Sequence, residues 1–202
     1  MPALGITGGV ATGKSIFTAR LVQCLSAVPF DADQCAHELL AHDADVRRAV
    51  LATFGENAFD HDGKPDRAHL RETVFADSSK RRELERILHP AIRARWIELA
   101  KHAAGSDRWF CADIPLLYET NAETHFAAVI VVACSPATQR ARLLEKRHLS
   151  TDLAEKIIAA QFDLTAKITR SDYLIWNDSS ATSLDRQTRL LVAALQQRFH
   201  HG

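Results

Sequence analysis

A glycine loop near the N-terminus constrains this 202-residue chain more than any other feature. Residues 8–15 read Gly-Gly-Val-Ala-Thr-Gly-Lys-Ser and directly follow the short apolar run of residues 4–7. The pattern Gly-x-x-x-x-Gly-Lys-Ser, between a strand and a helix, is typical of a loop that turns its backbone N–H groups around phosphate oxygens. Lys14 places a positive charge near those phosphates, and the Ser15 hydroxyl is suited to bind Mg²⁺. We therefore expect the chain to bind a nucleoside triphosphate.

Short apolar segments bounded by polar or turn residues recur along the chain and predict about five strands. Besides residues 4–7, they are residues 28–30, 109–114, 127–133 and 173–176. Three of them lack polar alternation, which favours a parallel sheet covered by helices on both faces. Residues 15–25 would form the helix after the glycine loop, with its N-terminus facing a ligand. The expected fold class is therefore α/β.

Two longer stretches have helical patterns and interrupt this series of strands. The first covers about residues 34–103, with turn residues at Gly55, at 62–65 and at Pro90, and is expected to be a helical insertion. The second covers residues 137–169 and is expected to form a mobile lid, with a plain exposed helix as the alternative. Its cations are Arg140, Arg142, Lys146, Arg147 and Lys156.

Composition excludes several functional classes. The 25 basic and 25 acidic residues cancel, so no overall field attracts nucleic acid or a membrane surface. The four cysteines form no Cys-x-x-Cys pair and no zinc-finger spacing, which indicates reduced thiols. No charged leader precedes the first apolar run, and no apolar run reaches the roughly 20 residues that span a bilayer. We therefore expect a cytoplasmic protein that binds neither nucleic acid nor membrane.

Three carboxylates follow predicted strands. Asp31 and Asp33 come after residues 28–30, and Asp113 ends the apolar run that starts at Trp109. Because parallel strands direct their carboxyl ends to one edge of a sheet, these side chains are expected near the bound phosphates. Asp113 suits support of Mg²⁺, and Asp31 or Asp33 suits the orientation of an acceptor hydroxyl. Capping of the following helix is the alternative role, above all for Asp31.

A phosphate loop alone does not separate kinases from GTPases or motors. The guanine-reading motif Asn-Lys-x-Asp of GTPases is absent from the sequence, and a motor usually needs a longer chain. A small-molecule kinase is therefore the favoured class.

Further segments, spread over nearly the whole chain, narrow this interpretation. They are residues 5–15, Asp-Ala-Asp at 31–33, Phe54-Gly55, Asp62-Gly63, Asp66-Arg67, Leu70-Arg71, Val74-Phe75, Leu88-His89-Pro90, residues 114–119, Gln139 with Arg142, Gln161, and Asp172 with Asn177. In this order the chain resembles the dephospho-coenzyme A kinase family.

The resemblance implies a P-loop kinase-type parallel sheet flanked by helices, with an inserted helical substrate domain and a helical lid. The nucleotide-binding core would comprise residues 1–33, 104–138 and 170–202, the substrate domain residues 34–103, and the lid residues 139–169. The implied reaction transfers the γ-phosphoryl group of ATP, with Mg²⁺, to the ribose 3′-hydroxyl of dephospho-coenzyme A. The protein would be a monomer or a weak homo-oligomer.

The resemblance also implies roles for individual residues. Asp33 would be the base, with Lys14 and Arg142 stabilising the transferring group. Mg²⁺ would be held by Ser15 and, through water, by Asp113. The nucleotide would be bound by Gly9, Val10, Ala11, Thr12, Gly13, Lys14, Ser15, Ile16, Arg142 and Asn177, the last of these near the adenine. The acceptor would be bound by Asp31, Asp33, Arg67, Arg71, His89 and Leu116.

Structural alternatives stay open for part of this set. Arg67 and Arg71 are four residues apart and could form only a solvated helix face. His89 before Pro90 could fix the entry to a helix.

The chain also departs from the family pattern at several positions. Ala11 and Thr12 stand where the family commonly has Gly-Ser, and the loop tolerates both provided that Ala11 keeps φ below zero. His37, Lys146 and Lys156 stand where arginine is expected, and a lysine offers a point charge in place of a two-pronged grip. Ser179 replaces an expected glycine after Asn177.

Two other functions therefore remain possible interpretations. One is a kinase for another small acceptor, such as a nucleoside monophosphate. The other is a catalytically weakened, regulatory nucleotide-binding protein, which the departures at residues 37, 146, 156 and 179 suggest.

Overall fold

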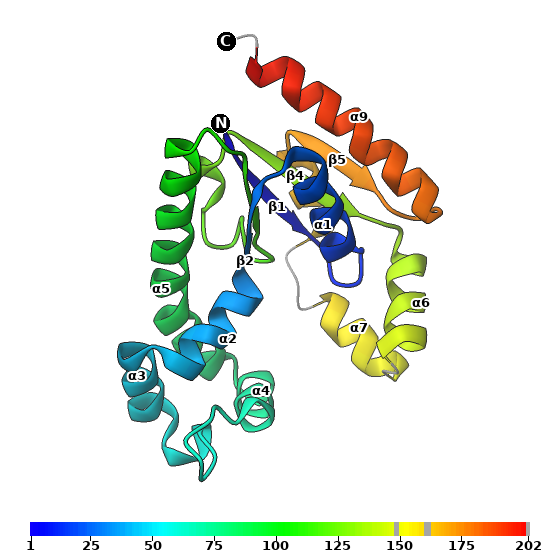
Figure 1. The fold of residues 1–202 in the computed structure, drawn as a ribbon. Coiled ribbons are helices and arrows are strands. Elements are labelled where there is room, and N and C mark those ends of the chain that lie inside the picture. The colour runs from blue at the N-terminus through cyan, green and yellow to red at the C-terminus, as the bar shows by residue number, and fades with distance from the viewer. Residues whose placement is uncertain (148–149, 160–162, 201–202) are drawn as a thin grey trace. The chain divides into compact units, whose positions relative to one another are not determined.

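The structure is a computed structural model that describes residues 1–147, 150–159 and 163–200 (Figure 1). Gln161 lies outside these residues. The elements are β1 (Ala3–Gly8), α1 (Lys14–Leu25), β2 (Val28–Asp31), α2 (Ala32–His42), α3 (Ala44–Phe54), η1 (Glu56–Ala58), α4 (Arg67–Ala76), α5 (Ser78–Gly105), β3 (Phe110–Asp113), η2 (Glu123–His125), β4 (Ala128–Ala133), α6 (Pro136–Arg147), α7 (Thr151–Ala159), α8 (Leu164–Arg170), β5 (Tyr173–Trp176) and α9 (Ala181–His200). The chain forms two compact units, Met1–Phe30 with Leu99–Gly202, and Asp31–Glu98.

The first unit is built on a five-stranded sheet with the strand order β2-β3-β1-β4-β5. β1 pairs in parallel with both β3 and β4, and β4 pairs in parallel with β5. Ile6 of the central strand lies opposite Asp113 on one side and Ile130 on the other. This register brings the carboxyl end of β3 beside the end of β1, where the glycine loop starts. The predicted α/β fold with a five-stranded parallel sheet is confirmed.

Helices α1 and α9 cover one face of this sheet (Figure 1). Phe17 and Leu21 of α1 and Leu195 of α9 are fully buried against apolar residues of β1, β4 and β5. Phe199, near the end of α9, meets the ring of Trp109 edge-to-face at a centroid distance of 5.9 Å. Burial of this apolar surface is the main force that holds the unit together.

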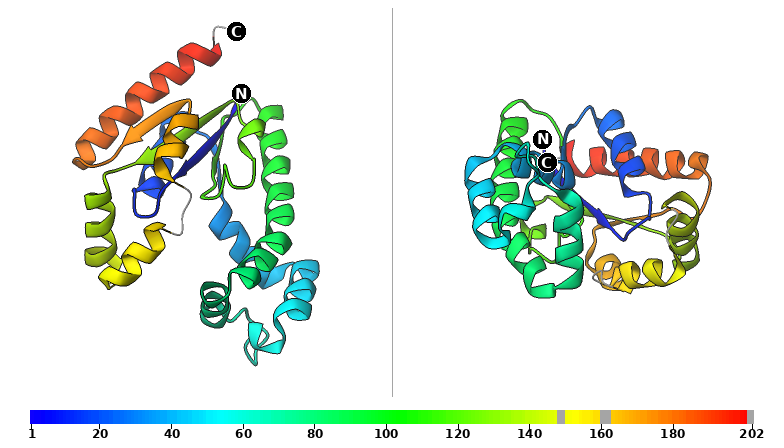
Figure 2. Two further views of the ribbon diagram at one scale, coloured as in Figure 1. Left: turned by 180° about the vertical axis from the view of Figure 1, so that it is seen from behind. Right: turned by 90° about the horizontal axis from the view of Figure 1, so that it is seen from below.

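The opposite face is covered by the segment after β3 and by α8, which contacts β4 (Figure 2). Gly5 of β1 lies under this segment, and a Cβ atom there would stand 2.7 Å from Leu117 and 2.8 Å from Phe126. A larger residue would therefore push the segment off the sheet. Among the described residues, no helix is both long enough and apolar enough to cross a membrane.

The second unit is helical, and aspartates start three of its helices. Asp31, Asp43 and Asp66 are the N-cap residues of α2, α3 and α4, and each accepts a backbone N–H bond in the first turn. Side-chain oxygens at this position satisfy amides that lack a partner within the helix. Gly55 ends α3 with a φ of 77°, a left-handed conformation that favours glycine.

Pro90 does not mark a turn, contrary to the interpretation of the sequence. It lies inside α5, which runs without a break from Ser78 to Gly105. His89 therefore does not fix the entry to a helix. A proline in this place has no N–H for the carbonyl four residues earlier, so it weakens the helix rather than starting it.

Replacement of Pro90 by Ala is expected to stabilise the protein by about 2 kcal/mol. The change restores one helical hydrogen bond and relieves the clash of the ring, partly offset by a more flexible unfolded chain. Urea unfolding followed by circular dichroism measures the difference. The matched control is Pro136→Ala at the first residue of α6, where proline is well tolerated and no gain is expected. Equal effects of the two changes would contradict the argument.

Candidate active site

The glycine loop is held from its outer side through four successive backbone carbonyls. The carbonyl of Gly9 accepts the Thr12 hydroxyl at 2.9 Å, and that of Val10 accepts the Gln139 side-chain amide at 2.8 Å. The carbonyl of Ala11 accepts Nη1 of Arg142 at 3.1 Å. Finally, the carbonyl of Thr12 accepts Nδ2 of Asn177 at 2.8 Å.

These bonds orient the loop for anion binding. In a trans peptide the carbonyl and the following N–H point in opposite directions. Outward carbonyls at residues 9–12 therefore turn the N–H groups of residues 10–13 to the inner side. The first amides of α1, which begins at Lys14, add to the same positive region. This arrangement of N–H groups suits the binding of phosphate oxygens.

Gly13 is required at its position for two reasons. Its φ is 86°, in the left-handed region, and a Cβ atom there would lie 2.2 Å from Nδ2 of Asn177. Asn177 is itself fixed, because its N–H donates to the carbonyl of Ala133 at 2.7 Å and its carbonyl accepts Nη2 of Arg142 at 2.8 Å. The side chain of Asn177 thus supports the loop, in addition to any contact with adenine.

Ala11 has a φ of 56°, so the negative φ on which its tolerance in the loop was predicted to depend is not observed. A left-handed conformation costs a residue with a Cβ roughly 1 kcal/mol or more. The hydrogen bonds on either side of Ala11 hold it there, and glycine would adopt the same conformation without strain.

Charged side chains at the start of α1 and at the end of β3 are paired. Lys14 forms an ion pair with Asp113, and both side chains are mostly buried. The hydroxyl of Thr18 lies 3.4 Å from the other carboxylate oxygen of Asp113. Asp113 thus holds the Lys14 ammonium at the mouth of the loop, where a phosphate can share it. Ser15 and Ile16, which follow in α1, are exposed, whereas Thr12 is fully buried.

Gln139 was missed as a site residue by the interpretation of the sequence. Its side chain is 5% exposed, and it lies one turn before Arg142 on α6. The spacing of three residues puts both side chains on one face of a helix, which is the signal that could have found it. Leu116 lies in the segment after β3, and its carbonyl accepts both the N–H and the hydroxyl of Thr120.

The second unit carries the carboxylates assigned to the acceptor. Asp31 caps α2 by accepting the N–H of Gln34 at 3.0 Å, so it does perform the capping role, and its role toward the acceptor stays a prediction. Asp33 lies in the first turn of the same helix and is exposed. The capping task is already done by Asp31, which leaves the Asp33 carboxylate available for another role.

The remaining acceptor residues lie on α4 and α5. Arg67 and Arg71 are both exposed, on successive turns of α4. His89 is half-buried in α5, and burial lowers the pKa of its imidazole, with Arg93 acting in the same direction and Glu85 against it. A neutral His89 is an uncharged hydrogen-bonding group at neutral pH.

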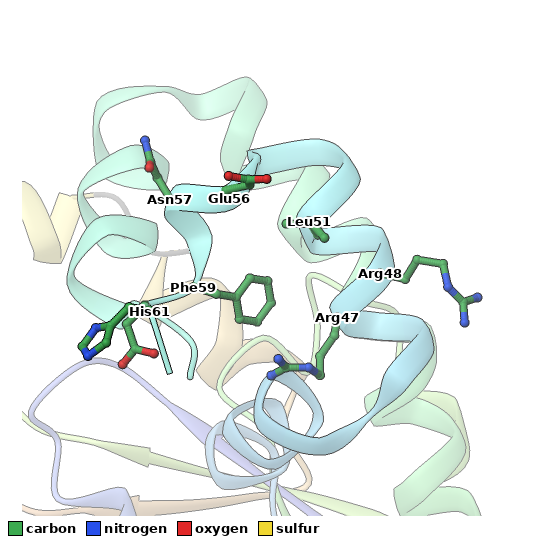
Figure 3. A pocket seen from close by; sticks show the side chains of 8 residues that line it. Arg47, Arg48, Leu51, Glu56, Asn57, Phe59 and His61 are labelled. Atoms are coloured by element: carbon green, nitrogen blue, oxygen red, sulfur yellow. The ribbon is translucent and has the colours of Figure 1, made fainter. Parts of the chain in front are cut away.

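A hollow of about 600 Å³ is present on the second unit, and Figure 3 shows the residues around it. Arg47 points toward the Phe59 ring, at 4.5 Å from its centroid, whereas Arg48 points away. The Arg47 guanidinium donates to the carbonyls of Leu40, Ala41 and Gly63. Arg47 therefore ties these backbone segments of the second unit together. None of the residues assigned to the acceptor lines the hollow. Its lining residues are Arg47, Arg48, Leu51, Glu56, Asn57, Phe59, Asp60 and His61.

Three of the departures from the family pattern fall on exposed side chains. His37, Lys156 and Ser179 are all exposed. Ser179 has no left-handed backbone, so the loop after Asn177 does not need glycine there. The side chain of Lys146 lies outside the described residues.

Comparison with known proteins agrees with this geometry. A family model described as dephospho-CoA kinase matches residues 3–183. A dephospho-CoA kinase from Symbiobacterium thermophilum is 39% identical over 195 residues, which cover 96% of this chain and 80% of that protein. One from Methylococcus capsulatus is 34% identical over 200 residues and covers 98% of this chain and 97% of its own. A solved dephospho-CoA kinase structure from Campylobacter jejuni has a TM-score of 0.72 at 26% identity, and the match covers 96% of this chain and 97% of that one.

The chain belongs to the dephospho-CoA kinase family.

Membership of the dephospho-CoA kinase family confirms that the chain is an ATP-dependent kinase, with ATP as co-substrate. Binding of this nucleotide by the glycine loop and the roles of the single residues stay predictions.

Replacement of Ala11 by Gly is expected to stabilise this dephospho-CoA kinase family member by about 0.5–1 kcal/mol. The gain is the relief of the left-handed strain, reduced by the greater freedom of glycine in the unfolded chain. Thermal and urea unfolding measure it. The matched control is Ala94→Gly, at an exposed site inside α5, where the same change should destabilise by about 1 kcal/mol. Two changes of the same sign would contradict the assignment of strain to Ala11.

Replacement of Gln139 by Ala is expected to weaken ATP binding about two- to tenfold. The loss corresponds to one hydrogen bond of about 0.5–1.5 kcal/mol that orients the Val10 peptide. Equilibrium titration with a non-hydrolysed ATP analogue measures the dissociation constant. Thr138→Ala, one residue earlier in α6, is a control that leaves the carbonyl of Val10 bound. Parent-like affinity in the Gln139 variant would show that the loop keeps its shape without this contact.

Proposed function

We propose that this kinase transfers the γ-phosphoryl group of ATP to the ribose 3′-hydroxyl of dephospho-coenzyme A, giving coenzyme A and ADP. The observation that carries the proposal is the glycine loop, whose outward carbonyls turn a row of N–H groups inward beside Lys14. Such a loop is an anion site built for the phosphates of a nucleotide. Membership of the dephospho-CoA kinase family supports the choice of acceptor.

In this proposal catalysis is mainly positioning and charge stabilisation. The loop amides and Lys14 bind the β- and γ-phosphates. Arg142 stabilises charge on the transferring group, because a guanidinium offers several donors to phosphate oxygens. Asn177 contacts the nucleotide from the loop after β5.

The acceptor hydroxyl needs a group that orients it and takes its proton. We assign this role to Asp33, which is exposed and has no capping duty at its helix. Asp31, Arg67, Arg71, His89 and Leu116 are assigned to binding of dephospho-coenzyme A. A neutral His89 would contact the acceptor as a hydrogen-bonding group rather than as a cation.

Mg²⁺ fits the donor set that the loop presents. Among the described residues, no three His, Cys, Asp or Glu side chains gather in a way that could hold a metal ion. This suits an ion that keeps most of its waters and binds largely through substrate phosphates. Ser15 would supply the protein oxygen and Asp113 a contact through water, and the ion would offset charge on the phosphates.

The two alternative functions are less well supported. A nucleoside monophosphate kinase or a weakened regulatory protein would not require the family match over residues 3–183. The departures that suggested lost activity fall on exposed side chains at residues 37, 156 and 179. The monomeric or weakly oligomeric state, the cytoplasmic location and the lack of nucleic-acid partners stay predictions from the sequence.

The direct test is to incubate the protein with Mg-ATP and dephospho-coenzyme A and to detect coenzyme A by mass. A panel of nucleoside monophosphates with detection of ADP runs in parallel. Formation of ADP with a monophosphate but not with dephospho-coenzyme A would replace the proposed acceptor. ATP binding without turnover of any acceptor would favour the regulatory alternative.

Replacement of Asp33 by Asn is expected to lower kcat by about 100-fold or more while ATP affinity changes little, because only proton transfer is lost. The chain offers a matched control, because Asp43-Ala44-Asp45 repeats the sequence Asp31-Ala32-Asp33. Asp45 lies in the first turn of α3 behind the cap Asp43, as Asp33 lies behind Asp31. Asp45→Asn should keep parent turnover, and Lys14→Ala serves as the inactive reference. Parent-like kcat in Asp33→Asn would remove Asp33 from the role of base.

A further inference from the structure

A lysine of α8 is buried beside the segment that follows β3. Lys167 is 2% exposed, and its ammonium forms an ion pair with Glu119 at 2.9 Å. It also donates to the carbonyl of Pro115 at 2.9 Å. The same carbonyl accepts the hydroxyl of Thr7 at 3.0 Å, one residue before the glycine loop begins. The proposed reaction gives this lysine no task.

A gain in the stability of the fold does not explain why the Lys167 ammonium is buried. An ammonium loses its hydration on burial, and an apolar side chain of similar size often stabilises a protein as well or better. The polar contacts of Lys167 are the Pro115 carbonyl and the Glu119 carboxylate, which belong to one short segment. This pattern is that of a side chain that holds a particular backbone conformation.

The segment held by Lys167 is the continuation of β3 beyond the sheet. Up to Asp113 the backbone is fixed by its pairing with β1, and the N–H of Ile114 still donates to the carbonyl of Ile6. Past that point the sheet ladder ends. Side chains from β1 and α8 then hold the Pro115 carbonyl, and the next residue is Leu116, which is assigned to the acceptor.

We infer that Lys167 is a positioning residue for the acceptor, acting through Pro115 and Leu116. The inference rests on the proposed function, because Leu116 has its role only there. Asp113 and Lys14 are held by the sheet and by each other, so loss of Lys167 should leave the donor side intact. Only the binding of dephospho-coenzyme A should weaken.

A second ion pair between the same helix and the same segment provides the control. Arg170 pairs with Glu123, and its guanidinium lies 4.3 Å from the centroid of the Tyr118 ring. This pair binds α8 to the segment farther along the chain and does not touch Pro115. Loss of it affects the attachment of α8 without releasing Leu116.

The test compares Lys167→Met/Glu119→Gln with Arg170→Met/Glu123→Gln. The first double variant removes both charges, so no buried carboxylate is left without its partner. We expect it to raise the KM for dephospho-coenzyme A about tenfold, to change the dissociation constant of ATP less than twofold, and to unfold near the parent temperature. The second double variant should keep the parent KM.

Thr7→Val keeps the inference testable if the first double variant does not fold. It removes only the hydroxyl that shares the Pro115 carbonyl and changes no charge, and we expect a KM for dephospho-coenzyme A about threefold higher. Suppose that the parent makes coenzyme A. The inference is then overturned if the folded variants keep the parent KM for dephospho-coenzyme A, or if their dissociation constant for ATP rises by the same factor as this KM. A parent that makes no coenzyme A would overturn the proposed function, and this inference with it.

Discussion

The site depends on a row of backbone carbonyls that must point away from the ligand. A loop can offer its N–H groups to phosphate only if its carbonyls find partners on the other side, because unpaired buried polar groups are costly. Here Gln139 and Arg142 of α6 and Asn177 after β5 supply those partners. Two elements more than a hundred residues away in sequence thus decide the conformation of the glycine loop, and the sheet that carries β4 and β5 sets where those elements start.

The charged side chains of the site are also held by specific partners. Lys14 at the start of α1 and Asp113 at the end of β3 neutralise each other, so neither charge is buried alone. Arg142 has five N–H donors, of which two bind the carbonyls of Ala11 and Asn177. It can therefore contact a phosphate without releasing the loop, which reconciles its structural contacts with the role proposed for it in transfer. A lysine in its place would present one compact ammonium instead of a fork, so it could not hold both carbonyls and bind a phosphate in the same way.

Much of the fold could be predicted from local patterns, because the strands are short apolar runs and the loop has a specific spacing. The position of Asp113 beside the loop followed as well, since parallel strands end at one edge of the sheet. The burial of Gln139 and Lys167 could not be predicted in this way. Both are polar residues on helices, where local sequence favours an exposed side chain, and only packing against distant segments buries them. Pro90 was misjudged for a related reason: local preference predicts a break, yet α5 continues through it.

Ala11 shows how tertiary contacts override a local preference. An alanine by itself avoids the left-handed region, so tolerance of Ala11 in this loop was predicted to require a negative φ. Its neighbours leave no such freedom, because the carbonyls of Val10, Ala11 and Thr12 are each bound by a different side chain. Three hydrogen bonds at about 1 kcal/mol each exceed a strain of roughly 1–2 kcal/mol. The strained conformation is therefore the more stable one as long as those three donors are present. The conformation of the loop thus depends on α6 and on the end of β5 as much as on the sequence of the loop itself.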